Sequence, residues 1–251
     1  MANNKIMRNI LKKIGEFIVL VISMAGYVPK NATILRTTVI LFSLVFSLYL
    51  TRYQPLNSNL AIIYFIISEI CYLGFITVVL SENGLRHWFI RRWGDERKGY
   101  QAYETALGLL FFHNGASIGY IASSTPDTLF HLSDKGLFLL IIPFIFICGF
   151  TIKIWAAKVV TINIYYWKDM FLGRKICEFV VTGPYKYFSN PMYGIGQLPA
   201  YAAAIWYGSK HGLIAAFVNQ FLIFSFYFLV EKKFIRRTYQ NPALQPANSD
   251  K

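Results

Sequence analysis

The fold is decided by residues 192–230, MYGIGQLPAYAAAIWYGSKHGLIAAFVNQFLIFSFYFLV. Two apolar runs, 192–207 and 213–230, flank the turn-forming segment GSKHG. As helices that rise about 1.5 Å per residue, the runs would cover roughly 20 to 25 Å and roughly 27 Å. They predict a helical membrane hairpin whose ends, at Tyr193 and Glu231, lie at a similar depth on one side of the bilayer.

A polar and aromatic loop, TGPYKYFSNPMY at 182–193, precedes this hairpin. Its Gly183 and two prolines break regular structure before the apolar run begins. Proline is tolerated in the first turn of a helix, so we expect the first helix to begin next to Pro191. The loop therefore leads directly from the aqueous side into a membrane helix.

The composition of the whole chain is that of a membrane protein. Of its 251 residues, 55% are hydrophobic and 15% are charged, and the mean hydropathy is +0.43. Water-soluble domains of this size rarely reach these values. The sequence predicts an all-α, polytopic integral membrane protein with about six transmembrane helices. The candidate spans are 35–50, 60–80, 106–123, 136–160, 192–207 and 213–230.

The basic residues are distributed unevenly between the connecting segments. With a cytoplasmic C-terminus, 20 of the 25 Lys and Arg lie on the inner side, and three lie in outer loops. The inner segments are 1–36, 81–104, 161–191 and 232–251. This asymmetry predicts that both termini face the cytoplasm. Anionic lipid headgroups account for the net charge of +13, so we expect no nucleic-acid partner.

The N-terminal residues 5–21 have apolar side chains at helical spacing and basic side chains on the opposite face. This pattern predicts an amphipathic helix that lies in the membrane interface. A cleavable signal peptide is the alternative. It is disfavoured because YVPK at 27–30 offers no cleavage site between small residues.

A few ionisable side chains fall inside the predicted spans, where they are costly and are functional candidates by default. These are Glu69, His113 and Lys153. Two of them have a structural alternative to a role in the reaction cavity. Lys153 would extend to the membrane interface, and His113 would bond to a neighbouring helix. The three cysteines form no Cys-x-x-Cys pair, so neither a metal site nor a disulfide is expected.

The C-terminal third resembles a known signature. GPY at 183–185, NPMY at 190–193 and an apolar hairpin ending in Glu231 are similar to the membrane methyltransferases that include phosphatidylethanolamine N-methyltransferase and isoprenylcysteine carboxyl methyltransferase. NPMY is typical of the phospholipid enzymes. Two positions depart from the pattern, because Lys232 follows Glu231 where a second Glu is usual, and CGFT at 148–151 has one glycine where a Gly-x-Gly is usual.

The resemblance implies an S-adenosylmethionine site at the cytoplasmic end of the hairpin. The cofactor carries a sulfonium cation, an adenosine and an amino-acid end, which require aromatic faces, hydrogen-bonding groups and a carboxylate. Without the resemblance, Pro191 and Tyr193 would be interpreted as the start of one helix and Glu231 as the polar end of another. The implied cofactor-binding residues are Thr182, Gly183, Pro184, Tyr185, Asn190, Pro191, Tyr193 and Glu231.

An amine acceptor must lose a proton before it can attack a methyl group. Asp169, Glu178 and His113 are the candidate bases, and no spacing decides among them. A lipid acceptor would also present a phosphate to the basic cytoplasmic rim. The candidate phosphate ligands are Arg91, Arg92 and Lys186, with Arg86, Lys168 and Arg174 on the same rim.

We therefore expect three regions: a membrane region at 1–160, a methyltransferase-like cofactor-binding region at 161–240 and a polar tail at 241–251. The predicted function is S-adenosylmethionine-dependent methylation of a membrane lipid amine of the phosphatidylethanolamine type, at a site facing the cytoplasm. One alternative is carboxyl or thiol methylation of a lipidated or small hydrophobic acceptor. Alternatives from other classes are a sterol-type reductase with a nicotinamide cofactor and a non-catalytic membrane protein.

Overall fold

A computed structural model describes residues 2–53, 58–130, 136 and 138–240, so the polar tail at 241–251 lies outside the described residues. Every regular element in these residues is helical, as the composition predicts. The α-helices are α1 (Ala2–Met24), α2 (Ile34–Tyr53), α3 (Ser58–Leu80), α4 (Arg86–Trp93), α5 (Glu96–Ser124), α6 (Phe138–Tyr165), α7 (Lys168–Leu172), α8 (Leu198–Trp206), α9 (Lys210–Phe226) and α10 (Lys232–Ile235). Short turns are η1 (Pro29–Asn31), η3 (Gly183–Lys186), η4 (Ile195–Gln197) and the π-helical η5 (Tyr227–Glu231) and η6 (Arg236–Gln240).

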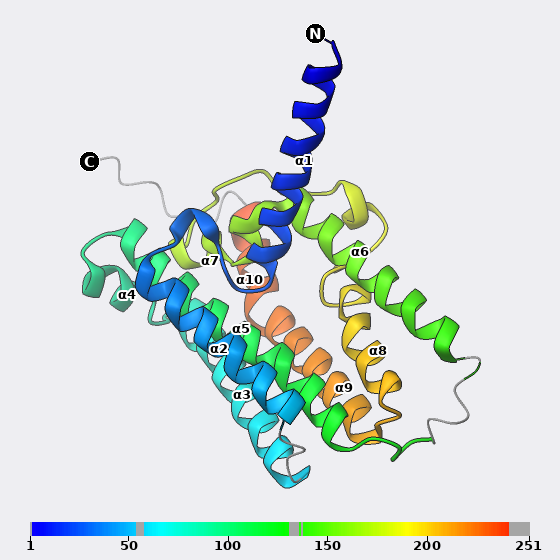
Figure 1. Cartoon of the computed structure of the whole chain (residues 1–251). Coiled ribbons are helices and arrows are strands. Elements are labelled where there is room, and N and C mark those ends of the chain that lie inside the picture. The colour runs from blue at the N-terminus through cyan, green and yellow to red at the C-terminus, as the bar shows by residue number, and fades with distance from the viewer. Residues whose placement is uncertain (1, 54–57, 131–135, 137, 241–251) are drawn as a thin grey trace, which may run out of the picture.

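The long helices form one bundle (Figure 1). Helix α5 packs against α2, α3, α8 and α9, and α6 packs against α8, which in turn contacts α9. The short helices α4, α7 and α10 gather at one end of this bundle, where α6 ends (Figure 1). The same end receives the C-terminal part of α1, whose N-terminal part projects away from the bundle.

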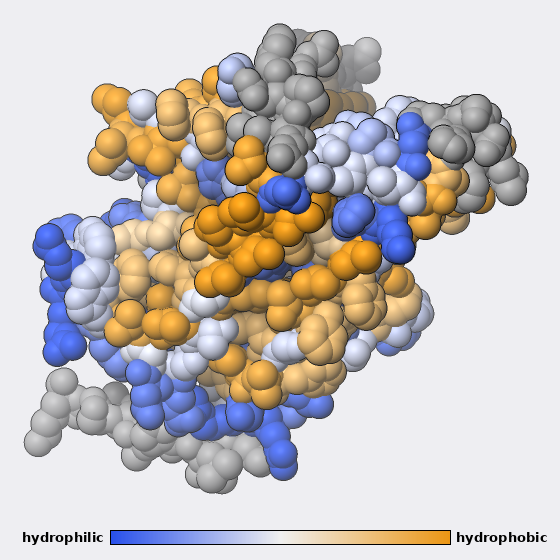
Figure 2. All heavy atoms as spheres, turned by 90° about the horizontal axis from the view of Figure 1, so that it is seen from below, coloured by the Kyte–Doolittle hydropathy of each residue, from blue (hydrophilic) through white to orange (hydrophobic). Residues whose placement is uncertain are grey.

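Among the described residues, three helices are long and apolar enough to cross a membrane, namely Ser58–Leu80, Leu140–Leu172 and Lys210–Gln240. A shorter apolar helix covers Ile34–Tyr49. Large hydrophobic side chains also remain on the surface, for example Phe42 at 71% exposure. Figure 2 shows such side chains gathered over the middle of one face, with hydrophilic side chains mainly along its edges. Apolar surface of this extent requires a non-aqueous environment, so the structure supports a location in the membrane.

The helix predicted at 5–21 lies within α1. Its apolar side chains are exposed, with Leu11 at 62%. The end of α1 is fixed by two tyrosines at the end of α6: Tyr166 Oη donates to the Ser23 carbonyl at 2.6 Å, and Tyr165 Oη donates to the Met24 carbonyl at 3.4 Å.

The hairpin differs from the prediction at its start. Helix α8 begins at Leu198, with Pro199 rather than Pro191 in its first turn. Residues 191–197 instead form turns, because the Gly194 N–H donates to the Asn190 carbonyl at 3.0 Å and the Gly196 N–H donates to the Pro191 carbonyl at 2.8 Å. The nine residues of α8 rise about 14 Å, and η4 adds about 6 Å, so the first arm still covers roughly 20 Å.

The turn of the hairpin lies where the sequence predicts it. Gly208 has a φ of +61°, a conformation that favours glycine. Ser209 then caps α9, because its side chain accepts a hydrogen bond from the Gly212 N–H at 2.9 Å. The second arm therefore starts at Lys210, three residues before the predicted apolar run.

The C-terminal end of α6 is shaped by two residues with positive φ. Thr161 has a φ of 69° inside the helix and marks a kink directly after the predicted span at 136–160. Trp167 adopts the left-handed conformation between α6 and α7. A bulky side chain in this region costs about 1–2 kcal/mol, so the surrounding packing must impose it. This corner turns the chain across the end of the bundle and supplies one wall of the site.

Candidate active site

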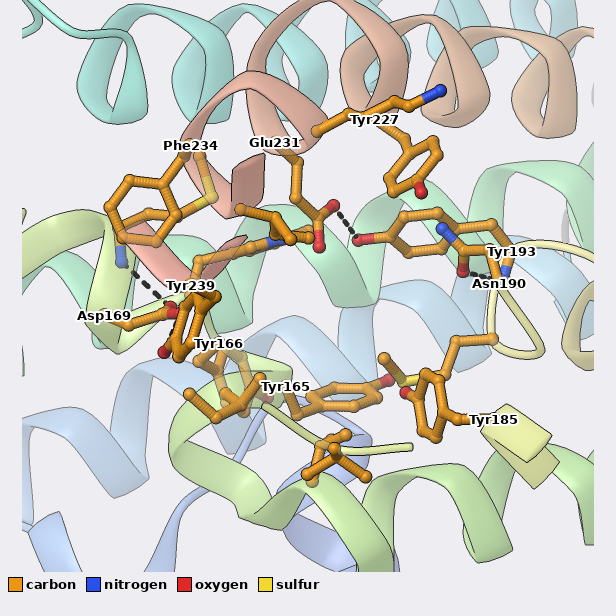
Figure 3. A pocket seen from close by; sticks show the side chains of 18 of the residues that line it. Tyr165, Tyr166, Asp169, Tyr185, Asn190, Tyr193, Tyr227, Glu231, Phe234 and Tyr239 are labelled. Atoms are coloured by element: carbon orange, nitrogen blue, oxygen red, sulfur yellow. Dashed lines mark hydrogen bonds between the residues drawn. The ribbon is translucent and has the colours of Figure 1, made fainter. Parts of the chain in front are cut away.

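A cavity of about 220 Å³ lies where the α6–α7 corner, the loop before α8 and the end of α9 converge (Figure 3). Aromatic residues are the most frequent class in its walls. The α6–α7 corner contributes Tyr165, Tyr166 and Trp167, and the other two segments contribute Tyr185, Tyr193, Tyr227 and Tyr239. Three carboxylates, Asp169, Glu178 and Glu231, also line it.

The central polar contact joins the loop to the hairpin. Tyr193 Oη donates to Glu231 Oε2 at 2.8 Å, and Figure 3 shows the carboxylate pointing across the cavity toward the phenol. The two residues, predicted to share one depth, are therefore in direct contact. Trp167 of the α6–α7 corner lines the same cavity. The Tyr193–Glu231 hydrogen bond thus ties the loop before α8 to the end of the hairpin.

The loop that carries Tyr193 is held from two sides. Asn190 Oδ1 accepts a hydrogen bond from the Tyr193 N–H at 3.3 Å. Gln220 on α9 donates through Nε2 to the Tyr193 and Gly194 carbonyls at 2.9 and 3.1 Å. The Tyr201 hydroxyl of α8 donates to Gln220 Oε1 at 2.6 Å and orients this amide. The position of Tyr193 is therefore fixed by the packing of both arms of the hairpin.

A second carboxylate lies at the other side of the cavity. Asp169 is only 6% exposed, and its Oδ2 accepts a hydrogen bond from Tyr239 Oη at 2.8 Å (Figure 3). Its Oδ1 accepts from the Met170 N–H at 2.9 Å, at the start of α7. Arg86 donates to the Met170 carbonyl at 3.2 Å and ties α7 to α4. Asp169 is thus a buried carboxylate in a fixed orientation.

The end of the hairpin leaves the regular α-helical pattern. Glu231 closes the π-helical turn η5, and Tyr239 lies in a second π-helical turn, η6. π-Helical turns are rare and occur frequently at functional sites. Here they lie next to the cavity and carry Glu231, which accepts the Tyr193 hydrogen bond, and Tyr239, which donates to Asp169.

Tyr185 supplies an unpaired donor. Its hydroxyl is buried in the cavity wall and has no hydrogen-bond partner among the described residues. Burial, and secondarily the nearby Glu231 carboxylate, raise the pKa of Tyr185, so its phenol stays protonated. The preceding Gly183 has a φ of +61°, and a Cβ there would meet Val159 Cγ2 at 2.9 Å. The turn therefore needs glycine to pack η3 closely against α6.

The predicted cofactor-binding residues fall into two groups. Tyr185, Asn190, Tyr193 and Glu231 line the cavity. The other four form the framework of the loop: Gly183, Pro184 and Pro191 shape its turns, with both prolines almost fully buried, and Thr182 is exposed.

The predicted bases are separated by the structure. Asp169 and Glu178 line the cavity, although Glu178 is exposed and forms an ion pair with Lys175 at 2.8 Å. His113 does not line it. Its Nδ1 lies 2.7 Å from Tyr64 Oη, between α5 and α3. The helix-to-helix contact that was the structural alternative for His113 is therefore present.

The other polar residues of the spans also hold helices together. Asn219 on α9 donates to Glu69 Oε1 on α3 at 2.7 Å and contacts Asn114 Oδ1 on α5 at 2.8 Å. Lys153 lines the cavity, with Nζ 5.6 Å from the centre of the Phe111 ring.

The predicted phosphate ligands lie away from the cavity. Arg91, Arg92 and Lys186 are exposed and do not line it. Lys168 and Arg174 line a different pocket, beside α5, where Arg174 forms a two-pronged ion pair with Glu96 at 2.6 and 2.8 Å.

Sequence reasoning missed several lining residues, above all Tyr239, Lys232 and Arg236. Tyr239 follows Glu231 by eight residues, about two helical turns, so the same-face spacing was the available signal. Lys232 and Arg236 belong to the basic tail that follows the hairpin. They differ from the adjacent Lys233 and Arg237 only in the side of the helix on which they lie, and the sequence does not show which side faces the cavity.

Comparisons with known proteins point to the segment that forms the cavity. Residues 139–242 match the phospholipid methyltransferase family. Over 98 residues, or 39% of this chain, the sequence is 34% identical to phosphatidylethanolamine N-methyltransferase 1 of Vanderwaltozyma polyspora. Over 88 residues, or 35% of the chain, it is 31% identical to phosphatidylethanolamine N-methyltransferase of Eremothecium gossypii. These matches confirm the resemblance predicted from the GPY and NPMY motifs, for the C-terminal part of the chain.

The similarity covers a small part of each relative. The matched segments cover 11% and 10% of the two relatives, so the chain corresponds to about a tenth of their length. No solved structure matches the chain.

Proposed function

We propose that this chain is a membrane methyltransferase that transfers a methyl group from S-adenosylmethionine to the amine of a phosphatidylethanolamine-type phospholipid. The observation that carries the proposal is the Tyr193–Glu231 hydrogen bond, which joins two parts of the family-matched segment across one aromatic cavity. The family and the names of both relatives support methyl transfer to a phospholipid.

The residues present fit this cofactor. A sulfonium cation is favoured by aromatic faces and by a carboxylate, and the cavity offers both at Tyr193, Tyr227 and Glu231. The unpartnered Tyr185 hydroxyl is a donor for a polar group of the ligand. When bound, S-adenosylmethionine would supply an electrophilic methyl group.

The side chains of the cavity would orient the acceptor, exclude water and remove a proton. We assign the proton to Asp169, because it is buried in the cavity wall while Glu178 is exposed and His113 lies elsewhere. The acceptor ammonium would give one proton to this carboxylate. The freed nitrogen lone pair would then be available to the electrophilic methyl group that the cofactor supplies.

Tyr239 would act on Asp169 rather than on the substrate. Its hydroxyl holds Oδ2 of the carboxylate in place, while the Met170 N–H holds Oδ1. A carboxylate with both oxygens hydrogen-bonded cannot rotate freely, so its proton-accepting lone pairs keep one direction. Tyr239 is therefore a positioning residue.

For the membrane topology we propose six spans, formed by α2, α3, α5, α6, α8 and α9, with both termini in the cytoplasm. The distribution of basic residues supports this arrangement. The short α8 would be accommodated by local thinning of the bilayer. We also propose that the exposed apolar face of α1 lies in the cytoplasmic interface. The cavity then opens to the cytoplasmic side.

Binding of the purified protein to S-adenosylmethionine and to NADPH, measured by isothermal titration in detergent, tests the class of protein. We expect saturable binding of S-adenosylmethionine and none of NADPH. Binding of the nicotinamide cofactor alone would favour the reductase alternative. Binding of neither would favour a non-catalytic membrane protein.

A further inference from the structure

The charged side chains of the cavity lie at different depths. Asp169 is buried in its wall, and Glu231 is half-buried beside Tyr193. Lys153 is partly buried, and the exposed carboxylate of Glu178 is already paired with Lys175. The exposed cations of the lining are Lys232 and Arg236.

The two cations share one face of the chain because they are four residues apart, across α10 and the start of η6. Lys232 Nζ lies 5.3 Å from the centre of the Phe228 ring, which holds this side chain over the preceding turn. Neither cation forms an ion pair with a carboxylate among the described residues. Both charges are thus available to an anionic ligand.

The neighbouring cations have a different orientation. Lys233 and Arg237 do not line the cavity. Arg237 forms an ion pair with Glu82 in the turn after α3, and this contact fixes the rotation of the segment. The basic run KKFIRR at 232–237 is therefore divided into one pair that faces the cavity and another that faces away.

We propose that Lys232 and Arg236 form the phosphate subsite for the acceptor, so that the lipid headgroup enters the cavity with its amine first. The proposal rests on the proposed function and names how its substrate is selected. A phosphoethanolamine headgroup carries an ammonium and a phosphate diester separated by two carbons. In this orientation the ammonium faces Asp169 and Glu231, and the phosphate lies beside the exposed Lys232 and Arg236.

The two side chains suit this ligand in different ways. Arginine binds phosphate oxygens in a two-pronged geometry, and lysine acts as a point charge. This pair takes the role that the sequence suggested for Arg91, Arg92 and Lys186. It also provides selection against the carboxyl and thiol acceptors of the alternative function, because these carry no phosphate next to the reacting group.

The test compares two acceptors in neutral vesicles: phosphatidylethanolamine and an alkyl amine without phosphate. Methyl transfer from labelled S-adenosylmethionine is measured for the wild type, Lys232→Gln, Arg236→Gln and the control Lys233→Gln. We expect each of the first two substitutions to raise KM for phosphatidylethanolamine roughly tenfold, with little change in kcat. KM for the alkyl amine should stay unchanged, and Lys233→Gln should behave like the wild type with both acceptors.

Different results reject different parts of the account. In one outcome, the wild type methylates both amines and Lys232→Gln raises KM equally for the two acceptors. This result would overturn the phosphate subsite alone. The same conclusion follows if Lys233→Gln matches Lys232→Gln. A wild type that methylates neither amine would reject the proposed function, and the subsite with it. S-adenosylmethionine binding and thermal unfolding of each variant show that the comparison is made on folded protein.

Discussion

The Tyr193 hydroxyl lies 2.8 Å from Glu231 Oε2, although 38 residues separate the two along the chain. The contact closes the helical hairpin at its open end and places the NPMY loop against the last turn of the second arm. Both partners lie in the segment that matches the phospholipid methyltransferases. The same contact that fixes the loop therefore also shapes the cavity.

Replacing Glu231 by Gln tests the role of the charge. The amide keeps the shape of the side chain and still accepts the Tyr193 hydrogen bond, but it no longer attracts a sulfonium cation. We expect S-adenosylmethionine affinity to fall roughly tenfold or more, because interactions with a charged partner contribute about 1.5–3 kcal/mol. Isothermal titration measures the loss. An unchanged affinity in a folded variant would mean that Glu231 only ends a helix.

Replacing Tyr193 by Phe removes the donor and keeps the ring. We expect the free energy of unfolding to fall by about 1 kcal/mol and cofactor binding to weaken several-fold, because Glu231 loses the group that orients it. The double variant with Glu231→Gln should be less impaired than the sum of the single variants. Strict additivity would show that the two side chains act independently on the cofactor.

Replacing Asp169 by Asn removes the proposed base. We expect kcat to fall by about a hundredfold or more, in the range that general bases contribute, with cofactor affinity nearly unchanged. Glu178→Gln is the matched control, since Glu178 also lines the cavity but is exposed. Initial rates with phosphatidylethanolamine measure both. A large loss for Glu178→Gln and none for Asp169→Asn would transfer the role to Glu178.

Gly149 tests how α6 and α8 pack. A Cβ at this position would lie 2.5 Å from Pro199 Cδ, 2.7 Å from Leu198 Cβ and 2.9 Å from the Ile195 carbonyl oxygen. We expect Gly149→Ala to destabilise the protein by about 1–3 kcal/mol through overpacking.

The control is Gly115→Ala on α5, where an added Cβ meets no atom within 4 Å. This change should be neutral or slightly stabilising, since alanine favours a helix over glycine. Thermal unfolding in detergent compares the two variants. Equal stability would show that α6 and α8 do not approach as closely as described.

The topology is tested with single cysteines in a variant that lacks Cys71, Cys148 and Cys177. We expect Lys98→Cys to react with a membrane-impermeant maleimide only from the cytoplasmic side, and Lys210→Cys only from the opposite side. Both positions are exposed: Lys98 lies in the first turn of α5, and Lys210 starts α9 and contacts Thr128 just after the other end of α5. Reaction of both from the same side would reject the six-span arrangement.

The sequence was sufficient for the features that depend on chain length and residue type. The rise per residue gives the two arms of the hairpin similar lengths. Tyr193 and Glu231 lie at the two open ends of these arms, so their proximity could be predicted. Gly208 and Ser209 have the residue types that a turn and a helix cap require. The helix start at Leu198 was not predictable in this way, because Gly194 and Gly196 allow backbone hydrogen bonds that delay the helix without breaking the apolar run.

The remaining site residues depend on helix rotation, which a hydropathy pattern does not fix in a membrane segment that is apolar on all sides. His113 faces Tyr64 between two helices, whereas Asp169 faces the cavity. Both appear in sequence as isolated polar residues near apolar runs. Lys232 and Lys233 are adjacent residues of the same type, so the sequence does not show which of them faces the cavity. The π-helical turns before and after α10 set the rotation of this segment.

The central claim is tested most directly by the position of the methyl group in the product. Purified protein is incubated with isotopically labelled S-adenosylmethionine and a mixed lipid extract, and the methylated product is identified by fragmentation mass spectrometry. We expect label on the headgroup nitrogen of a phosphatidylethanolamine-type lipid. Label on a carboxylate, a thiol or a non-lipid molecule, with none on that nitrogen, would contradict this expectation.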